Sequence, residues 1–186
     1  MSYYFWADTH FNHEGILSYT ARPYSNIKEM NDALVEKWNS VVKKEGDTVW
    51  VLGDFGFHHS RGEDLFQIFY RLRGKKSLVI GNHDEKNPVV LRLPWERAEM
   101  LTHFKAEKHR ATLCHYPLET WKGSHSGTLM LHGHCHGTLK RKLPKRFDVG
   151  VEVEPVPVEW SELVERASKE TFWATDAHGE RVEVDM

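Results

Sequence analysis

Apolar residues in the first half of the chain alternate between two kinds of pattern. Short runs of aromatic and β-branched residues predict three buried strands: Tyr3–Ala7, Thr48–Leu52 and Ser77–Ile80. Apolar residues at helical spacing predict a helix with Asn26 as N-cap and Gly46 as stop signal, and a second helix over about Glu63–Leu72. The order strand, helix, strand, helix, strand indicates an α/β arrangement.

Strand patterns dominate the second half. Four further strands are expected: Lys105–Lys108, Ala111–Cys114, Thr128–Leu131 and Phe147–Val153. A helix is predicted over Pro157–Lys169, and a closing strand pair within Thr171–Val184, around His178-Gly179. Together the two halves predict a layered α/β fold, in which sheets form the core and helices cover their outer faces.

Length and composition are those of an ordinary folded protein. With 186 residues, 40% of them hydrophobic and 28% charged, the chain predicts one domain over residues 1–186. No apolar run reaches the ~20 residues of a membrane span, and the start lacks the basic region of a signal peptide, so we expect a cytoplasmic protein with no membrane partner. A net charge of −2 gives no global attraction to nucleic acid.

Polar side chains follow the predicted strands. Asp8 and His10 come directly after the first one and are one residue apart, so on an extended backbone both project from the same face. His134 and His136 repeat this spacing across Cys135. Two pairs of side chains are therefore expected to grip metal ions.

Three more potential metal ligands lie at the ends of predicted strands: Asp54, Asn82 and His115. Imidazole and carboxylate ligands together suit Zn, Mn, Fe or Co, and a carboxylate can bridge two cations, whereas a neutral imidazole cannot. Asp54 is the candidate bridge. Thirteen histidines, several grouped with Asp or Asn, also favour a metal site.

Five short blocks contain all of these residues in one order: Asp8-x-His10, Gly53-Asp54, Gly81-Asn82-His83-Asp84, His115 and Gly133-His134-x-His136. With them the sequence resembles the calcineurin-like metallophosphoesterase family. The resemblance implies a sandwich of two mixed β-sheets flanked by helices. It also implies seven ligands in two sets joined by a bridge: Asp8, His10 and His136 for one cation, Asn82, His115 and His134 for the other, and Asp54 for both.

The resemblance further implies that His83 lies beside the substrate phosphate and assists the leaving oxygen, while Asp84 orients His83. Two cations roughly 3.5–4 Å apart lower the pKa of a bridging water, which then attacks phosphorus. Mn is the expected metal, with Fe, Zn, Ni or Co as alternatives. On the substrate side we expect Asn12, His13 and Arg22, whose guanidinium suits a phosphate oxygen.

The leading hypothesis is therefore a dinuclear phosphoesterase that acts on mono- or diesters of a small phosphorylated substrate or nucleotide. One alternative is a nucleic-acid or cyclic-nucleotide phosphodiesterase that uses the basic stretch 140–146. Another is a non-catalytic metal-binding scaffold of the same fold. A homodimer is compatible with the sequence.

The remaining candidates receive structural interpretations. Exposed positions without chemistry are expected for six histidines: His58, His59, His103, His109, His125 and His178. Cys114 and Cys135 are expected to pack in the core. The aromatic residues are also assigned to the core, except that Phe11 and Phe55, next to ligands, are candidates for the site.

Overall fold

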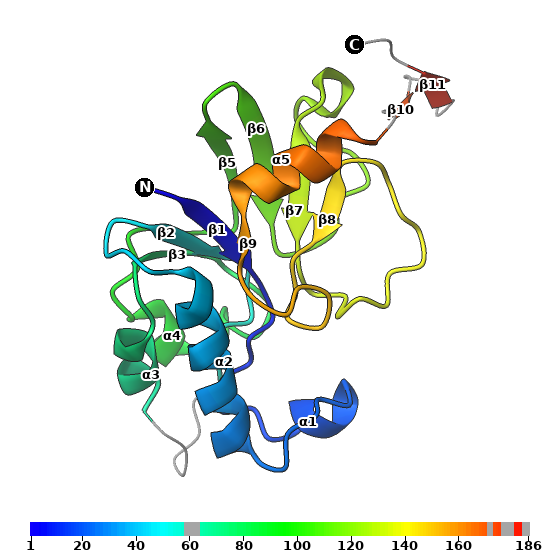
Figure 1. Cartoon of the computed structure of the whole chain (residues 1–186). Coiled ribbons are helices and arrows are strands. Elements are labelled where there is room, and N and C mark those ends of the chain that lie inside the picture. Colours follow the sequence, from blue (N-terminus) through cyan, green and yellow to red (C-terminus); the bar gives the residue numbers. More distant parts are fainter. Residues whose placement is uncertain (58–63, 171–172, 176–180, 184–186) are drawn as a thin grey trace.

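The structure is a computed structural model that describes residues 1–57, 64–170, 173–175 and 181–183 (Figure 1). Two β-sheets form the body of the fold, and helices pack against them. Within the described ranges, no helix has the length and apolar character needed to cross a membrane.

The first sheet has the strand order β4-β3-β2-β1-β9. Its strands are β1 (Tyr3–Trp6), β2 (Thr48–Val51), β3 (Lys75–Val79), β4 (Ala98–Glu99) and β9 (Val158–Glu159). Strands β1 to β4 are parallel, and β9 is antiparallel to β1. The carboxyl ends of β1, β2 and β3 therefore meet at the same edge of the sheet.

The second sheet has the order β5-β6-β7-β8. Its strands are β5 (Leu101–Ala106), β6 (His109–Cys114), β7 (Leu129–His132) and β8 (Arg146–Asp148). β5 and β6 form an antiparallel hairpin, while β6, β7 and β8 run parallel. Both sheets are mixed, which confirms the predicted α/β sandwich.

The helices are α1 (Ile16–Tyr19), α2 (Ile27–Val41), α3 (Leu65–Arg71), α4 (Pro88–Leu91) and α5 (Trp160–Ser168), with a 3₁₀ turn η1 (Ser124–Ser126). The predicted terminal strand pair is confirmed as β10 (Trp173–Thr175) antiparallel to β11 (Arg181–Glu183). Its turn, with His178-Gly179, lies outside the described residues, as do Glu63, His58 and His59.

Several predicted boundaries were wrong. The N-cap of α2 is confirmed, since the Asn26 side chain accepts the Glu29 N–H, but the helix ends at Val41 because Val42 is already extended, well before Gly46. β5 begins at Leu101, because its pairing with β6 extends from Leu101 to Ala106. β8 ends at Asp148, since the chain turns back when Val153 and Glu154 donate to the Gly150 carbonyl.

Two apolar clusters lie on opposite faces of β1. Phe5 and Ala7 belong to the cluster shared with the second sheet and α5, whereas Tyr4 and Trp6 belong to the cluster under α2 and α3. This alternation gives β1 two buried faces, as expected for a central strand of a parallel sheet.

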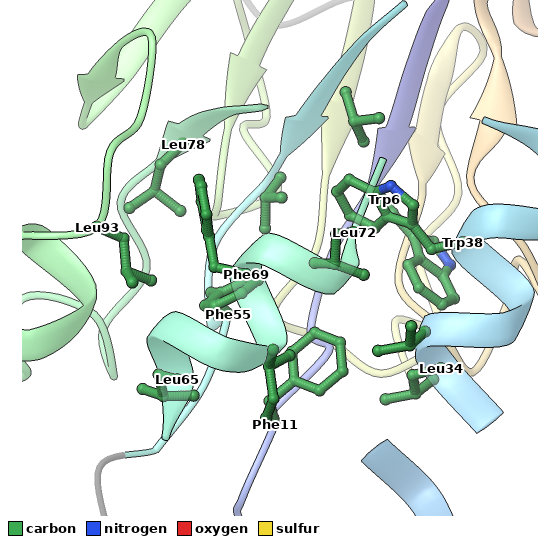
Figure 2. Close-up of a cluster of buried hydrophobic side chains, with 14 of the residues drawn as sticks. Trp6, Phe11, Leu34, Trp38, Phe55, Leu65, Phe69, Leu72, Leu78 and Leu93 are labelled. Atoms are coloured by element: carbon green, nitrogen blue, oxygen red, sulfur yellow. The ribbon is translucent and has the colours of Figure 1, made fainter. Parts of the chain in front are cut away.

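Figure 2 shows the cluster under the helices, where the Trp6 and Trp38 rings lie 6.2 Å apart. Phe11 and Phe55 are fully buried in this cluster, so their assignment as candidates for the site was wrong. Burying a large apolar side chain contributes about 1.5–3 kcal/mol. These rings therefore anchor the two loops that leave β1 and β2.

Candidate metal centre

The predicted ligands converge from five strand ends. Asp8 and His10 follow β1, Asp54 follows β2, and Asn82 follows β3 in the first sheet; His115 follows β6, and His134 and His136 follow β7 in the second. The sandwich brings the two sets of loops together. Two groups of potential ligands form here, and within each group the ligand atoms lie within 4.8 Å of one another. The groups are Asp8, His10 and His136, and Asp8, Asp54 and His115.

The first cluster combines Asp8, His10 and His136. The two imidazole rings stack with centroids 5.3 Å apart. Among the described residues, His10 Nε2 and His136 Nδ1 are buried without a hydrogen-bond partner, although His136 Nδ1 lies 3.1 Å from Glu152 Oε2. Burial lowers the pKa of His10, which keeps its imidazole neutral, the form that binds metals. A cation would satisfy these nitrogens.

The second cluster forms around Asn82. Its Oδ1 lies 3.0 Å from both His115 Nε2 and His134 Nδ1. His115 Nδ1 lies 2.8 Å from the Leu52 carbonyl oxygen. Because a carbonyl only accepts, Nδ1 carries a proton and Nε2 is the atom directed toward the cluster, an orientation typical of metal-binding histidines.

Asp54 lies between the two clusters. Its Oδ2 is 3.6 Å from His10 Nε2 and 3.5 Å from His115 Nε2, and its Oδ1 accepts the His83 N–H at 2.9 Å. One carboxylate oxygen therefore faces a histidine of each cluster. This is the position that a bridging ligand requires.

The carboxylates differ in their electrostatics. Burial raises the pKa of Asp8 to about 7. Burial also acts to raise the pKa of Asp54, but the hydrogen bond and charge of His115 outweigh it and bring this pKa down to about 2. Burial acts to lower the pKa of His115, but the hydrogen bond and the charge of Asp54 outweigh it and raise this pKa to about 9. A cation beside Asp8 would stabilise its charged form, since an opposite charge favours ionisation.

The backbone of the candidate ligands is unusual. Asp8, His10, Asp54, His134 and His136 have φ angles of 57°, 48°, 55°, 69° and 46°, five of the nine positive values at non-glycine residues in the described ranges. The expected extended geometry of the two spaced pairs was therefore wrong. Left-handed residues cost about 1–3 kcal/mol each and gather at functional sites, where the surroundings hold them in place.

Two glycines make room for the ligands. A Cβ atom on Gly53, whose φ is 90°, would lie 2.2 Å from His115 Nδ1, and one on Gly81 would lie 2.3 Å from Asp54 Oδ1. No larger residue fits either place without moving a ligand. Steric exclusion of a Cβ atom thus explains why Gly53 and Gly81 precede Asp54 and Asn82 in the two sequence blocks.

His83 lies at the margin of the two clusters. Its Nε2 is 4.0 Å from Asp54 Oδ2, and its side chain is 36% exposed. Asp84 does not orient this ring as expected: among the described residues its carboxylate accepts the N–H groups of Asp54, Phe55 and Gly81. Asp84 therefore fixes the backbone of two ligand loops.

The expected substrate residues His13 and Asn12 have different surroundings. The His13 ring is 5.5 Å from the His10 ring and 5.7 Å from that of His83, and the three residues form a third group of potential ligands. The Asn12 Oδ1 accepts a hydrogen bond from Asn31 of α2 at 2.7 Å. This bond ties the loop after β1 to the helix.

Arg22 has another role than the one expected. Its guanidinium donates to the carbonyls of Asp8 and Thr9 at 2.6 and 2.8 Å and to Glu152 at 2.7 and 3.0 Å, and only 4% of its side chain is exposed. The predicted phosphate contact is not supported, because the donors are already used. Glu152 was missed by the sequence interpretation, and no local motif marks it.

A cavity of about 480 Å³ opens beside His83 and Asn82. Its other walls are Phe57, Lys86, Asn87 and Pro88. The Asn87 side chain caps α4 and bonds to the Gly56 carbonyl, so it is structural. Phe57 and Lys86 remain as an apolar and a cationic wall next to the clusters.

The fold and the ligand clusters define an α/β sandwich protein with a candidate metal centre at the carboxyl edge of its sheets. A family model described as calcineurin-like phosphoesterase matches residues 1–175. The chain belongs to the calcineurin-like phosphoesterase family.

The chain is also similar to individual proteins over most of their length. The chain is 30% identical to the uncharacterized protein MJ1445 of Methanocaldococcus jannaschii over 157 residues, which cover 82% of each chain. It is 26% identical to the Gene 66 protein of Mycobacterium phage L5, over 88% of this chain and 89% of the phage protein. The crystal structure of AQ665 from Aquifex aeolicus, a protein of unknown function, superposes with a TM-score of 0.71 at 24% identity, over 88% of this chain and 98% of that one, and shows the same fold.

Proposed function

We propose that this protein hydrolyses phosphate mono- or diesters with the help of two divalent cations, of which Mn²⁺ is the expected one. The observation that carries the proposal is the place of Asp54 Oδ2, which lies within 3.5 and 3.6 Å of imidazole nitrogens from two separate clusters. A single carboxylate there can serve two metal ions.

The residues fit such a pair of ions. Both clusters offer imidazole nitrogen and carboxylate or amide oxygen, a mixture suited to Mn, Fe, Co or Zn. Asp8, His10 and His136 would hold one ion, Asn82, His115 and His134 the other, and Asp54 both. When bound, two such cations neutralise phosphate oxygens and lower the pKa of an attacking water.

His83 would act on the leaving group. Its ring lies at the margin of the clusters and lines the cavity of about 480 Å³, so a phosphate at the clusters would present its leaving oxygen to this imidazole. The protonated ring can donate to that oxygen as charge develops, a contribution of typically 10²–10⁴-fold. The His83 N–H bond to Asp54 holds the residue in register with the bridging carboxylate.

The cavity indicates the kind of substrate. Its volume suits a small molecule. Phe57 offers an aromatic face and Lys86 a positive charge. An aryl or nucleoside group on the leaving oxygen fits these walls.

The test combines metal analysis with a substrate panel. Protein reconstituted with Mn²⁺ is assayed on p-nitrophenyl phosphate, its bis-ester, cyclic nucleotides and single-stranded oligonucleotides. We expect two metal ions per chain and turnover of at least the aryl ester. Two bound metals without turnover of any substrate would instead support a non-catalytic scaffold.

Variants separate the roles. Asp54→Asn should lose metal from both clusters, because the bridge loses its charge, whereas His83→Ala should keep both metals and slow turnover about 10²–10⁴-fold. Asp32→Asn changes a half-buried carboxylate on α2 that pairs with Lys28 and Arg71; it is the matched control and should change neither metal content nor turnover. An Asp54→Asn protein that retains two metals at normal occupancy would refute the bridging assignment.

A further inference from the structure

A second concave surface lies away from the metal centre, against the β5–β6 hairpin. This groove has a volume of about 670 Å³. Its chemistry is set by seven basic or titratable side chains: Lys105, Lys108, Arg110, Lys122, His103, His109 and His125. β6 begins at the groove and ends just before His115, so its six residues, at about 3.3 Å each, separate the groove from the metal centre. Figure 1 shows the β5–β6 turn at the top of the molecule.

The groove is positively charged and unneutralised. Lys105, Lys108, Arg110 and Lys122 are exposed, none of them forms an ion pair within the described part of the chain, and no described carboxylate lines the groove. Some exposed cations elsewhere are paired, as Arg141 is with Glu119 at 2.7 Å. The groove thus gathers four exposed cations without a described ion-pair partner in a chain whose net charge is −2.

The strand register places two of these cations directly opposite each other. Lys105 pairs with Arg110 across the β5–β6 ladder, so both side chains project from the same face. Like charges at such positions destabilise a hairpin. An anion between them would remove this repulsion, which indicates a ligand with negative charge.

Among the described residues, the groove has no exposed Phe, Tyr or Trp ring for stacking. Phe104, its only residue of these three types, is buried against Phe5 and Trp160. Proteins that recognise bases of single strands use exposed aromatic rings, while contacts to phosphates use Lys and Arg. The groove is therefore suited mainly to a phosphate backbone.

We propose that this groove binds the phosphate backbone of a single-stranded nucleic acid, independently of sequence. Its volume is that of a small-molecule pocket, which admits a segment of one strand. The four cations would contact successive phosphates. The proposal does not depend on the activity of the metal centre, and it assigns a surface to His103 and His125, which the sequence interpretation left without chemistry.

The test is the salt dependence of binding. Fluorescence anisotropy of a labelled 12-residue oligothymidylate is measured with the full-length protein in EDTA, and a gel afterwards confirms that the oligonucleotide is intact. For a single strand, log K falls with log salt by about 0.7 per phosphate contact. Four contacts predict an affinity loss of about 50-fold between 50 and 200 mM salt.

Paired variants locate the surface. Lys105→Gln/Arg110→Gln should reduce the affinity loss between 50 and 200 mM salt to about sevenfold, because two phosphate contacts remain. Lys105→Arg/Arg110→Lys should restore the full dependence. Lys140→Gln/Lys142→Gln, in the other basic stretch, removes the same charge and should leave it unchanged.

Three outcomes would overturn the proposal. An unchanged salt slope in the Lys105→Gln/Arg110→Gln variant would exclude the groove. A reduced slope in the Lys140→Gln/Lys142→Gln variant alone would assign binding to that stretch. Displacement of the oligonucleotide by 10 mM inorganic phosphate at matched ionic strength would mean that a single phosphate ion is the ligand.

Discussion

Replacement of Arg22 by methionine tests whether this residue builds the site or contacts the substrate. Methionine keeps most of the apolar stem and removes the guanidinium. In the structure the guanidinium bonds to the carbonyls of Asp8 and Thr9 and to the Glu152 carboxylate. The substitution therefore leaves two carbonyls and a largely buried carboxylate without their donor.

The expected loss follows from these contacts. Only 14% of the Glu152 side chain is exposed, and removal of one partner from a buried ion pair typically costs about 3–5 kcal/mol. Arg22→Met should therefore lower the free energy of unfolding by roughly that amount. The control is Arg141→Met, whose ion pair with Glu119 is 61% and 55% exposed and should contribute less than about 1 kcal/mol.

Urea unfolding in EDTA measures this loss without a contribution from metal binding. Kinetics with an aryl phosphate in Mn²⁺ supply the second readout. If Arg22 contacts phosphate instead, the variant should raise KM and unfold at the urea concentration of the parent protein. That result would refute a structural role for the Arg22 guanidinium.

Three further predictions concern other parts of the molecule. Gly81→Ala should reduce metal content, since its Cβ would lie 2.3 Å from Asp54 Oδ1, while Gly46→Ala, with nothing within 4 Å, should leave metal content unchanged. Burial lowers the pKa of Lys76 to about 8, so between pH 8 and 10.5 the unfolded chain binds a proton that the folded chain does not. The free energy of unfolding, measured by thermal unfolding, should therefore rise by roughly 1–3 kcal/mol over this pH range, and Lys76→Met should abolish the rise. Phe57→Ala should raise KM for aryl phosphates about 3–10-fold without affecting alkyl phosphates, and an equal change for both would exclude stacking.

The convergence of the candidate ligands was predictable because strand patterns and polar residues agree in the sequence. β1, β2 and β3 end within a residue or two of the predicted positions, and each delivers its donor to the same edge of a parallel sheet. Sequence spacing alone does not show which strand ends meet in space, and the sheet topology determines this. It brings Asp54 to His115, across 61 positions of sequence, with 3.5 Å between their atoms.

The supporting contacts were not predictable from local patterns. Arg22 and Glu152 are 130 residues apart, and nothing in either neighbourhood indicates the other. The family resemblance implied that Asp84 orients the His83 ring, yet the turn directs the carboxylate to the backbone of Asp54 and Phe55. Such partners depend on how loops cross, which only the folded chain determines.

The loops that hold the ligands also support one another, so the two clusters form one structural unit. Asp8 N–H donates to the Gly53 carbonyl at 3.0 Å, His10 N–H to the Asp54 carbonyl at 2.9 Å, and His134 N–H to the Asp8 carboxylate at 2.9 Å. These bonds hold ligands in left-handed conformations that are unfavourable in isolation. A change that loosens the loop after β1 should therefore displace Asp54 as well, and lower metal occupancy in both clusters even where it touches only the first.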